Sequence, residues 1–160
     1  MAELRSDEEQ LDAVKRWWKE NGVSLVAGAV IAAAGVFGWN AWQNYQQGQS
    51  EAASMRYQQL VNMTTGSDLE EDQLTSAREL VSEINDEHGN TLYAELALLL
   101  DARLAVQQGD LESAKTALES VADNSSRRYV QSLAWLRLAR IELAEGNPDQ
   151  ALALLDEPIS

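Results

Sequence analysis

The apolar residues of this chain are gathered into one block near its start. Residues 23–42 contain only two polar side chains, Ser24 and Asn40, and no charged residue. A helix needs about 20 residues to cross the roughly 30 Å hydrocarbon core of a bilayer. We therefore predict a transmembrane helix over residues 22–42. The alternative is a buried core helix of a soluble domain, which would usually be shorter and would carry a polar flank.

Basic residues precede the block closely but follow it only at a distance. Lys15, Arg16 and Lys19 come just before it, and the next basic residue after it is Arg56. Positive residues near a span favour the cytoplasmic side of the membrane. The pattern predicts that residues 1–21 form a cytoplasmic tail and that the chain after the span lies on the other side.

Aromatic residues mark both ends of the block, as in the interfacial belts of membrane proteins. They are Trp17, Trp18, Trp39, Trp42 and Tyr45. A cleaved signal peptide is the competing interpretation, but its apolar stretch would be shorter and a small-residue cleavage site would follow it. Residues 40–50 offer no convincing site of that kind, so the pattern favours an uncleaved anchor.

Small residues recur on one face of the predicted span. Gly28, Ala32 and Gly35 stand at helical spacings of four and three residues. Such a stripe allows another helix to approach closely in lipid, and we interpret it as a contact surface. The alternative is that glycine and alanine are simply common in membrane spans, which requires no partner.

After the span the pattern changes to amphipathic helices separated by short polar stretches. Residues 43–51 are polar and predict a stalk or linker. Helical periodicity then covers six segments: residues 52–63, 73–88, 91–108, 111–122, 127–145 and 148–156. Strand patterns are absent from the sequence, so we predict an all-α fold.

The last two helix pairs repeat at an offset of 37 residues. At this offset Ala102 aligns with Ala139, each is followed by an arginine, and a glycine turn ends each first helix. A helix pair recurring near 34 residues is the signature of tetratricopeptide-type solenoids. We therefore predict one N-terminal transmembrane helix followed by a tetratricopeptide-like helical-repeat solenoid over residues 52–160. A generic bundle of helical hairpins is the alternative.

The composition excludes several classes of function. The chain carries 12 basic and 26 acidic residues, a net charge of -14, whereas nucleic-acid binders present basic patches. It has no cysteine and a single histidine, His88, so thiolate sites and histidine dyads are not expected. Motifs for phosphate loops, serine nucleophiles and metal ligation are absent from the sequence. We predict a protein that is not an enzyme and uses no cofactor; the alternative is an enzyme subunit whose acidic domain binds a small molecule or cation.

Three segments carry a resemblance to a known family. They are QLDAVKRWWKENG at 10–22, GWNAWQNYQ at 38–46 and LRLARIEL at 136–143. With the layout of the whole chain, they resemble the YfgM family of bacterial inner-membrane proteins, the ancillary subunits of the SecYEG translocon. The resemblance implies a cytoplasmic N-terminus, one span in the lipid bilayer and a periplasmic repeat domain. It also implies two partners, the SecYEG translocon and a membrane-anchored periplasmic prolyl-isomerase-like chaperone, and it implies no catalytic residue.

The function expected from this resemblance is that of a membrane-anchored protein-interaction module. It would be ancillary to the translocon and would link protein export to periplasmic chaperones. The alternative keeps the interaction module but makes it a scaffold for another envelope or cell-division complex.

The C-terminal end departs from the resemblance. Members of the family usually continue past the equivalent of Ser160, and repeat arrays need a polar cap at each end. The last segment instead ends on four apolar residues, namely Leu152, Leu154, Leu155 and Ile159. We therefore expect a chain truncated at its C-terminus.

The repeat also predicts a partner groove. In tetratricopeptide-like solenoids the first helices of the pairs line the concave surface. The aligned positions on these helices are Leu96 with Leu133, Leu99 with Leu136, and Arg103 with Arg140. Two guanidinium groups one repeat apart could hold a carboxylate or backbone carbonyls of a bound segment. The alternative is that both arginines pair with nearby acids such as Asp101 and Glu142.

Overall fold

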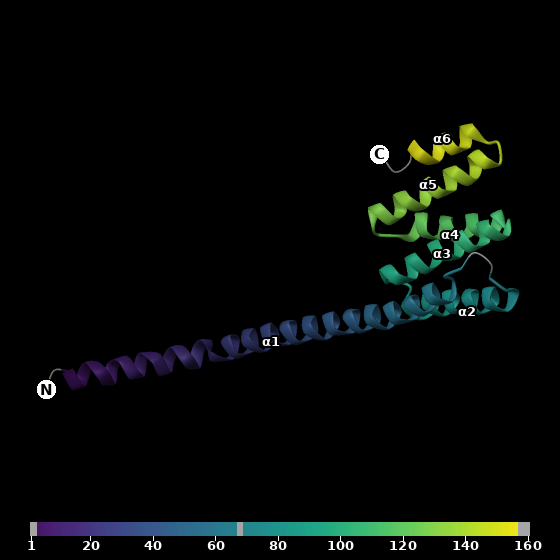
Figure 1. Cartoon of the computed structure of the whole chain (residues 1–160). Helices are drawn as coiled ribbons and strands as arrows, with labels where there is room; N and C mark the ends of the chain where they lie inside the picture. Colours follow the sequence, from purple (N-terminus) through teal and green to yellow (C-terminus); the bar gives the residue numbers. More distant parts are fainter. Residues whose placement is uncertain (1–2, 67–68, 157–160) are drawn as a thin grey trace. The chain divides into compact units, whose positions relative to one another are not determined.

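The computed structural model describes residues 3–66 and 69–156 (Figure 1). These residues form six α-helices and no strand, which confirms the all-α prediction. The helices are α1 (Glu3–Met63), α2 (Glu71–His88), α3 (Leu92–Gln108), α4 (Leu111–Asn124), α5 (Arg128–Ala144) and α6 (Pro148–Asp156). The five helices that follow α1 begin and end within two residues of the predicted segments. Ile159 and Ser160, which entered the prediction about the C-terminal end, lie outside the described residues.

The chain divides into two compact units, Met1–Gln46 and Gln47–Ser160. The division falls within the stretch 43–51 that we predicted as a stalk or linker, and this stretch is helical throughout. Helix α1 therefore contributes to both units. Its last turns belong to the unit that also holds α2 to α6, and we refer to that unit as the repeat domain.

The turns between the helices form where the sequence supplies caps. The Thr91 hydroxyl accepts a hydrogen bond from the Ala94 N–H at the start of α3, at 3.3 Å. Asp110 does the same for the Ser113 N–H at the start of α4, at 3.1 Å. Gly109 has a φ of 77°, a left-handed conformation that favours glycine after a helix. The chain can therefore reverse between α3 and α4 without strain.

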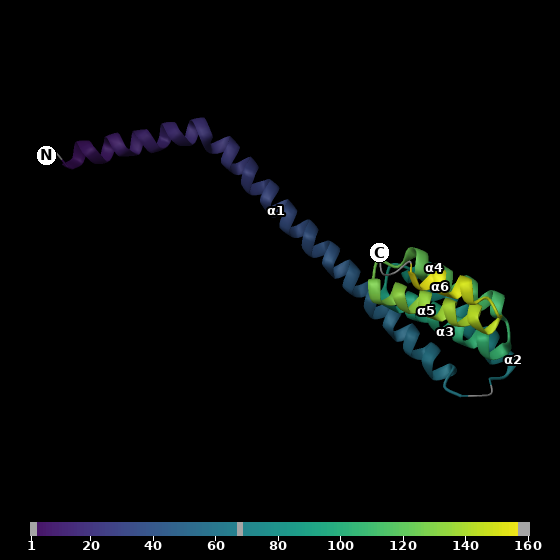
Figure 2. The ribbon, with the colours of Figure 1, turned by 90° about the horizontal axis from the view of Figure 1, so that it is seen from above.

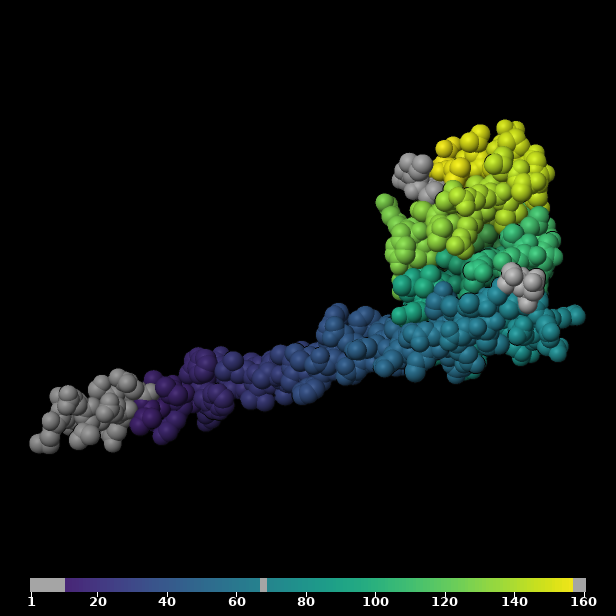
Figure 3. All heavy atoms as spheres, in the orientation of Figure 1, coloured from purple at the N-terminus to yellow at the C-terminus, as the bar shows by residue number. Residues whose placement is uncertain are grey.

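The helices of the repeat domain stack in chain order. Each of α2, α3, α4 and α5 packs against the helix that follows it. The space-filling view shows successive layers from teal to yellow (Figure 3), and α3 to α6 overlie one another when seen from above (Figure 2). Contacts between sequence neighbours are the mark of a quasi-one-dimensional solenoid, so the arrangement agrees with the predicted repeats.

Two clusters of buried side chains hold the stack together. The larger joins α3, α4 and α5, and the smaller joins the end of α1 to α2 and α3. Ala102 and Ala139, which align at the 37-residue offset, are both buried. Trp135 is half-buried and packs against the larger cluster, so it serves the core.

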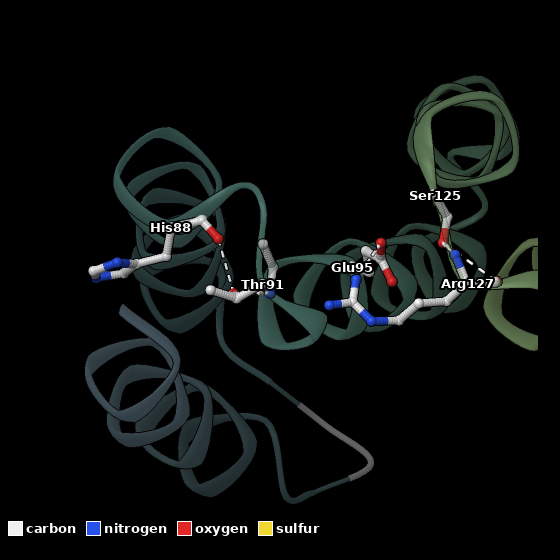
Figure 4. Close-up of polar contacts among 6 residues, drawn as sticks. His88, Thr91, Glu95, Ser125 and Arg127 are labelled. Atoms are coloured by element: carbon white, nitrogen blue, oxygen red, sulfur yellow. Dashed lines mark hydrogen bonds and ion pairs between the residues drawn. The ribbon is translucent and has the colours of Figure 1, made fainter. Parts of the chain in front are cut away.

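Polar contacts tie the loops to the helices beside them (Figure 4). The Thr91 hydroxyl donates to the His88 carbonyl at 2.8 Å, which closes the loop between α2 and α3. Arg127 lies just before α5, and its Nη1 donates to Glu95 Oε1 of α3 at 2.9 Å. The Arg127 N–H in turn donates to the Ser125 hydroxyl at 3.1 Å. The start of α5 is thus held against the start of α3.

A buried acid joins α4 to the end of α5. Lys115 Nζ lies 2.6 Å from Glu142 Oε1 and also pairs with Glu145. Asn147 Nδ2 donates to the second oxygen of Glu142 at 2.9 Å. The hydrogen bond from Lys115, followed by the one from Asn147, holds the pKa of the Glu142 carboxyl below its ordinary value. The hydrogen bonds to Glu142 and then to Glu145 raise the pKa of Lys115. The ion pair is therefore fully formed at neutral pH.

This arrangement predicts a pH-dependent contribution to stability. A carboxyl with a lowered pKa in the folded state stabilises the protein above its unfolded pKa, and the contribution is lost as the pH falls through the folded pKa. Glu142→Gln should therefore melt below the wild type at pH 7, and the gap should narrow as the pH falls below 4.5, the ordinary value. Thermal melts of the full chain across this range measure the gap. Glu119→Gln changes an exposed acid that makes no ion pair among the described residues, and serves as control. A gap that stays constant down to pH 3 would contradict the assignment.

Candidate functional site

Helix α1 carries the apolar block in the first unit. Among the described residues it is the one helix long and apolar enough to cross a membrane, judged by length and composition. Its apolar side chains are exposed, and Ile31 and Phe37 have 72% and 75% of their surface accessible. A core helix would bury these side chains against the protein, so the block does not behave as the core helix of a soluble domain.

Small side chains lie open on this helix. Gly28, Ala32 and Gly35 are exposed, and a Cβ added at either glycine would meet no atom within 4 Å. Another helix therefore has room to approach this face.

The flanking residues of the block lie on the surface of α1. Lys15, Arg16 and Lys19 are exposed, and Lys15 Nζ is 3.8 Å from an Asp12 carboxylate oxygen. The indole of Trp18 lies over Gly22, where an added Cβ would come within 3.3 Å of it. The remaining aromatic residues at the two ends of the block are also exposed: Trp17, Trp39, Trp42 and Tyr45. The aromatic and basic side chains are thus available to a membrane surface.

A cavity lies between α3, α4 and α5 of the repeat domain. It has a volume of about 360 Å³. Three arginines line it, Arg103 from α3 and Arg137 and Arg140 from α5. The other lining residues are apolar apart from Gln107: Ala102, Val106, Leu111, Leu118, Ile141 and Ala144. The cavity therefore combines an apolar wall with guanidinium groups.

The two arginines one repeat apart line the same cavity. This juxtaposition follows from the repeat, because Arg103 and Arg140 occupy equivalent positions on α3 and α5. Arg137 is held in the wall, since its Nη1 donates to the Leu99 carbonyl at 3.0 Å. Within residues 3–66 and 69–156, neither Arg103 nor Arg140 forms the alternative ion pair with a neighbouring acid. Asp101 and Glu142 have other cationic partners.

The acids Asp101 and Glu142 contact other residues. An Asp101 carboxylate oxygen lies 3.8 Å from Arg78 Nε of α2. Burial raises the pKa of Asp101, and the charge of Arg78 opposes that rise. Glu142 is occupied by Lys115 and Asn147. Neither acid neutralises Arg103 or Arg140.

The leucines predicted to line the groove do not line the cavity. The prediction for Leu99 is wrong, because its side chain is 4% exposed and belongs to the core cluster of α3, α4 and α5. Leu96 is half-buried and packs against the same core. Leu133 and Leu136 are exposed on α5 but are not part of the cavity wall. The four leucines predicted to line the groove therefore lie partly in the core and partly on the surface outside the cavity.

The repeat comparison missed the residues that α4 supplies to the cavity. Leu111 and Leu118 come from the second helix of a pair, whereas the predicted groove used positions on the first helices only. Arg137 and Ala144 were also missed, although they stand three residues before and four residues after Arg140 on one helical face. That spacing is the signal in the sequence that would have found them. Among the described residues, no group of three or more acids or histidines is placed to hold a metal ion.

Comparison with known proteins identifies the family of the chain. The tetratricopeptide repeat-like domain family matches residues 15–160. An ancillary SecYEG translocon subunit of Haemophilus influenzae is 30% identical over 98% of this chain and 74% of its own length. The chain belongs to this family of ancillary SecYEG translocon subunits.

Other members of the family agree. The ancillary SecYEG translocon subunits of Aggregatibacter actinomycetemcomitans and Escherichia coli are 35% and 31% identical. The matches cover 97% and 94% of this chain, and 73% and 70% of those proteins. No solved structure matches the chain. Membership in the family confirms the resemblance that segments 10–22, 38–46 and 136–143 indicated.

Proposed function

We propose that this chain is a membrane-anchored protein-interaction module of the SecYEG translocon in the bacterial inner membrane. The observation that carries the proposal is the match to relatives that bear the name ancillary SecYEG translocon subunit and that align with nearly the whole chain. The exposed apolar stretch of α1 supports a single-pass anchor. The helical repeats support a role in binding proteins. The module acts as an adaptor and catalyses no reaction.

The repeat domain works on the periplasmic side in this proposal. Lys15, Arg16 and Lys19 precede the span, and positive residues favour the cytoplasmic side. There the domain would link the emerging export substrate to periplasmic folding factors. The partner proposed for this role is a membrane-anchored periplasmic prolyl-isomerase-like chaperone, as the family resemblance implies.

Co-purification from membranes tests the proposal. The tagged full chain, solubilised in mild detergent, should retain the SecYEG subunits and the chaperone, identified by mass spectrometry. A single-span inner-membrane protein of unrelated sequence, expressed at the same level, is the control and should retain neither. Recovery of envelope or cell-division proteins in place of SecYEG would contradict the proposal.

The proposed orientation in the membrane can be tested by labelling single cysteines introduced on either side of the span. The chain has no cysteine, so each introduced thiol is the only one. Ser126→Cys should react with a membrane-impermeant maleimide in intact spheroplasts, and Ser6→Cys should react only after permeabilisation. Changing Lys15, Arg16 and Lys19 together to Glu should lower the labelling of Ser126→Cys, because the topology signal is lost. Labelling of Ser6→Cys in intact spheroplasts would show that the N-terminus lies outside, contrary to the proposed orientation.

The small-residue face of α1 is proposed as a contact with a helix of the translocon. Gly28→Leu and Gly35→Leu place bulk on this face, where α1 itself leaves space. Leucine is favourable in lipid, so insertion should persist while co-purification of SecYEG falls severalfold. Ile31→Leu is a matched control that adds no bulk. If both glycine variants retain SecYEG fully, the small-residue face of α1 contacts lipid and not a helix of the translocon.

A further inference from the structure

The cationic side chains of the repeat domain are mostly engaged. Residues 40–160 hold eight basic and 20 acidic residues. Arg56 pairs with Glu83 and Glu87, Arg78 pairs with Asp101 and Asp110, Lys115 pairs with Glu142 and Glu145, and Arg127 pairs with Glu95. Arg137 donates to a backbone carbonyl.

Three arginines remain without an ion pair or hydrogen bond to any residue that the structure describes. They are Arg103, Arg128 and Arg140. Two of the three line the cavity between α3, α4 and α5, and Arg128 does not. Two guanidinium groups without an ion pair therefore line one cavity in a domain that is rich in acidic residues.

The described residues that line the cavity carry no negative charge. They include three arginines and no Asp or Glu. Guanidinium groups gathered around a partly apolar hollow attract an anion, because the low-dielectric wall strengthens the interaction. The charge of the cavity is opposite to that of the domain around it. The ligand that complements it is anionic.

The wall specifies a second feature of the ligand. Leu118 and Ile141 are buried and form part of the lining, and Val106 stands at it with 44% of its surface exposed. The volume of about 360 Å³ lies in the usual range for ligand sites, roughly 300–1,000 Å³. An aliphatic group that covers this wall loses contact with water. The ligand is therefore amphipathic, with an apolar part beside the negative charge.

A second hollow lies beside the same part of α3. That hollow, of about 490 Å³, shares Arg103 and Gln107 with the first and reaches Tyr57, Thr64 and Thr65 at the end of α1. Arg103 and Gln107 line both hollows, and we refer to the two hollows together as the groove. The second hollow is lined by Thr64, Thr65 and Gln107, which can hydrogen-bond a peptide backbone, and by the apolar Val61 and Leu100. An extended run of chain can occupy both parts, whereas a small molecule would fill one.

We propose that this groove binds an extended segment of a partner protein in which an acidic residue stands beside an aliphatic one. The carboxylate accepts hydrogen bonds from Arg103 and Arg140, and the aliphatic side chain packs against Leu118 and Ile141. The proposal rests on the protein-interaction role proposed above, and it specifies the chemistry of the segment that is bound. Basic segments are repelled by the same arginines.

Selection from a random peptide library tests the assignment. The full chain, held in nanodiscs of uncharged phosphatidylcholine, is presented with a phage-displayed library of randomised octapeptides. The wild type should enrich peptides in which Asp or Glu neighbours Leu, Ile, Val or Met. The double variant Arg103→Gln, Arg140→Gln should not enrich them. Arg128→Gln removes an unpaired arginine outside the groove, and it should select the same peptides as the wild type.

Affinity for a synthetic peptide of the selected sequence measures the contribution of each group. Loss of one charge-assisted contact should weaken binding about tenfold, and loss of both about a hundredfold. Arg128→Gln should stay within about twofold of the wild type. Val106→Asn should also weaken binding severalfold, because it changes the apolar wall at an exposed position. Circular dichroism establishes that each variant is folded.

Several results would overturn the assignment. Selected peptides without acidic residues, basic peptides, or equal selection by the double variant would each do so. A fatty acid or anionic lipid found by native mass spectrometry on the wild type and lost from the double variant would assign the groove to lipid. Co-purification of SecYEG with the wild type separates the two proposals. If SecYEG is retained and no acidic peptide is selected, the groove assignment fails while the proposed function stands.

Discussion

Leu104→Ala is expected to destabilise the repeat domain by about 2–5 kcal/mol. Leu104 lies in the C-terminal half of α3 with 1% of its surface exposed, and it packs in the cluster that joins the end of α1 to α2 and α3. Truncating a buried leucine loses its transfer free energy and leaves a cavity that the surroundings fill only in part. The loss should lower the melting temperature of the full chain in detergent by at least about 8 °C.

Leu143→Ala is the matched control for this prediction. It makes the same substitution in a helix of the same length, but the Leu143 side chain is 61% exposed. The change in intrinsic helix propensity is the same for both residues, and the main difference between them is burial. We expect a change within about 0.5 kcal/mol, as for other surface substitutions. Equal melting temperatures for the two variants would mean that α3 does not bury Leu104.

Arginines placed in the middle of the apolar block are expected to release the chain from the membrane. An arginine at the centre of a spanning helix costs roughly 2.5–3.5 kcal/mol, and two at neighbouring turns cost about twice that. Val30→Arg with Ala34→Arg places both charges in the stretch 23–42, which holds no charge of its own. Alkaline extraction of membranes should leave the wild type in the pellet and move most of the variant to the supernatant.

The control moves the same charges out of the block. Gln46→Arg with Gln47→Arg adds two arginines to the polar stretch after it, where side chains reach water. This variant should remain in the pellet like the wild type. Resistance of the Val30 and Ala34 variant to extraction would show that the block is not embedded in lipid. In that case the anchor assigned to α1 would be wrong.

The helices after α1 could be predicted because their signals are local. The Gly109 turn and the caps at Thr91 and Asp110 depend on residues close in the chain. The equivalence of Ala102 and Ala139 could be found by aligning the chain with itself, since a solenoid repeats its packing at fixed intervals. Both alanines are buried, as that alignment requires.

Which residues of a helix are buried could not be predicted from the repeat alignment. Leu99 and Leu136 align in the repeat, yet Leu99 is buried and Leu136 is exposed. The two helices have different neighbours, since α3 packs between α2 and α4 and α5 packs between α4 and α6. A repeat alignment treats the two positions alike. Burial depends on what stands next to each repeat, and that is a property of the stack.

The sequence by itself determined the apolar block, the all-α class, the repeat and the family, because each depends on residue order and spacing along the chain. Only the tertiary structure decided which charges remain unpaired. Asp101 is taken by Arg78 from α2, and Glu142 by Lys115 from α4. Arg103 and Arg140 are thereby left facing a cavity to which α4 also contributes. Pairing of charges depends on distances between side chains of different helices, and those distances arise only when the helices pack.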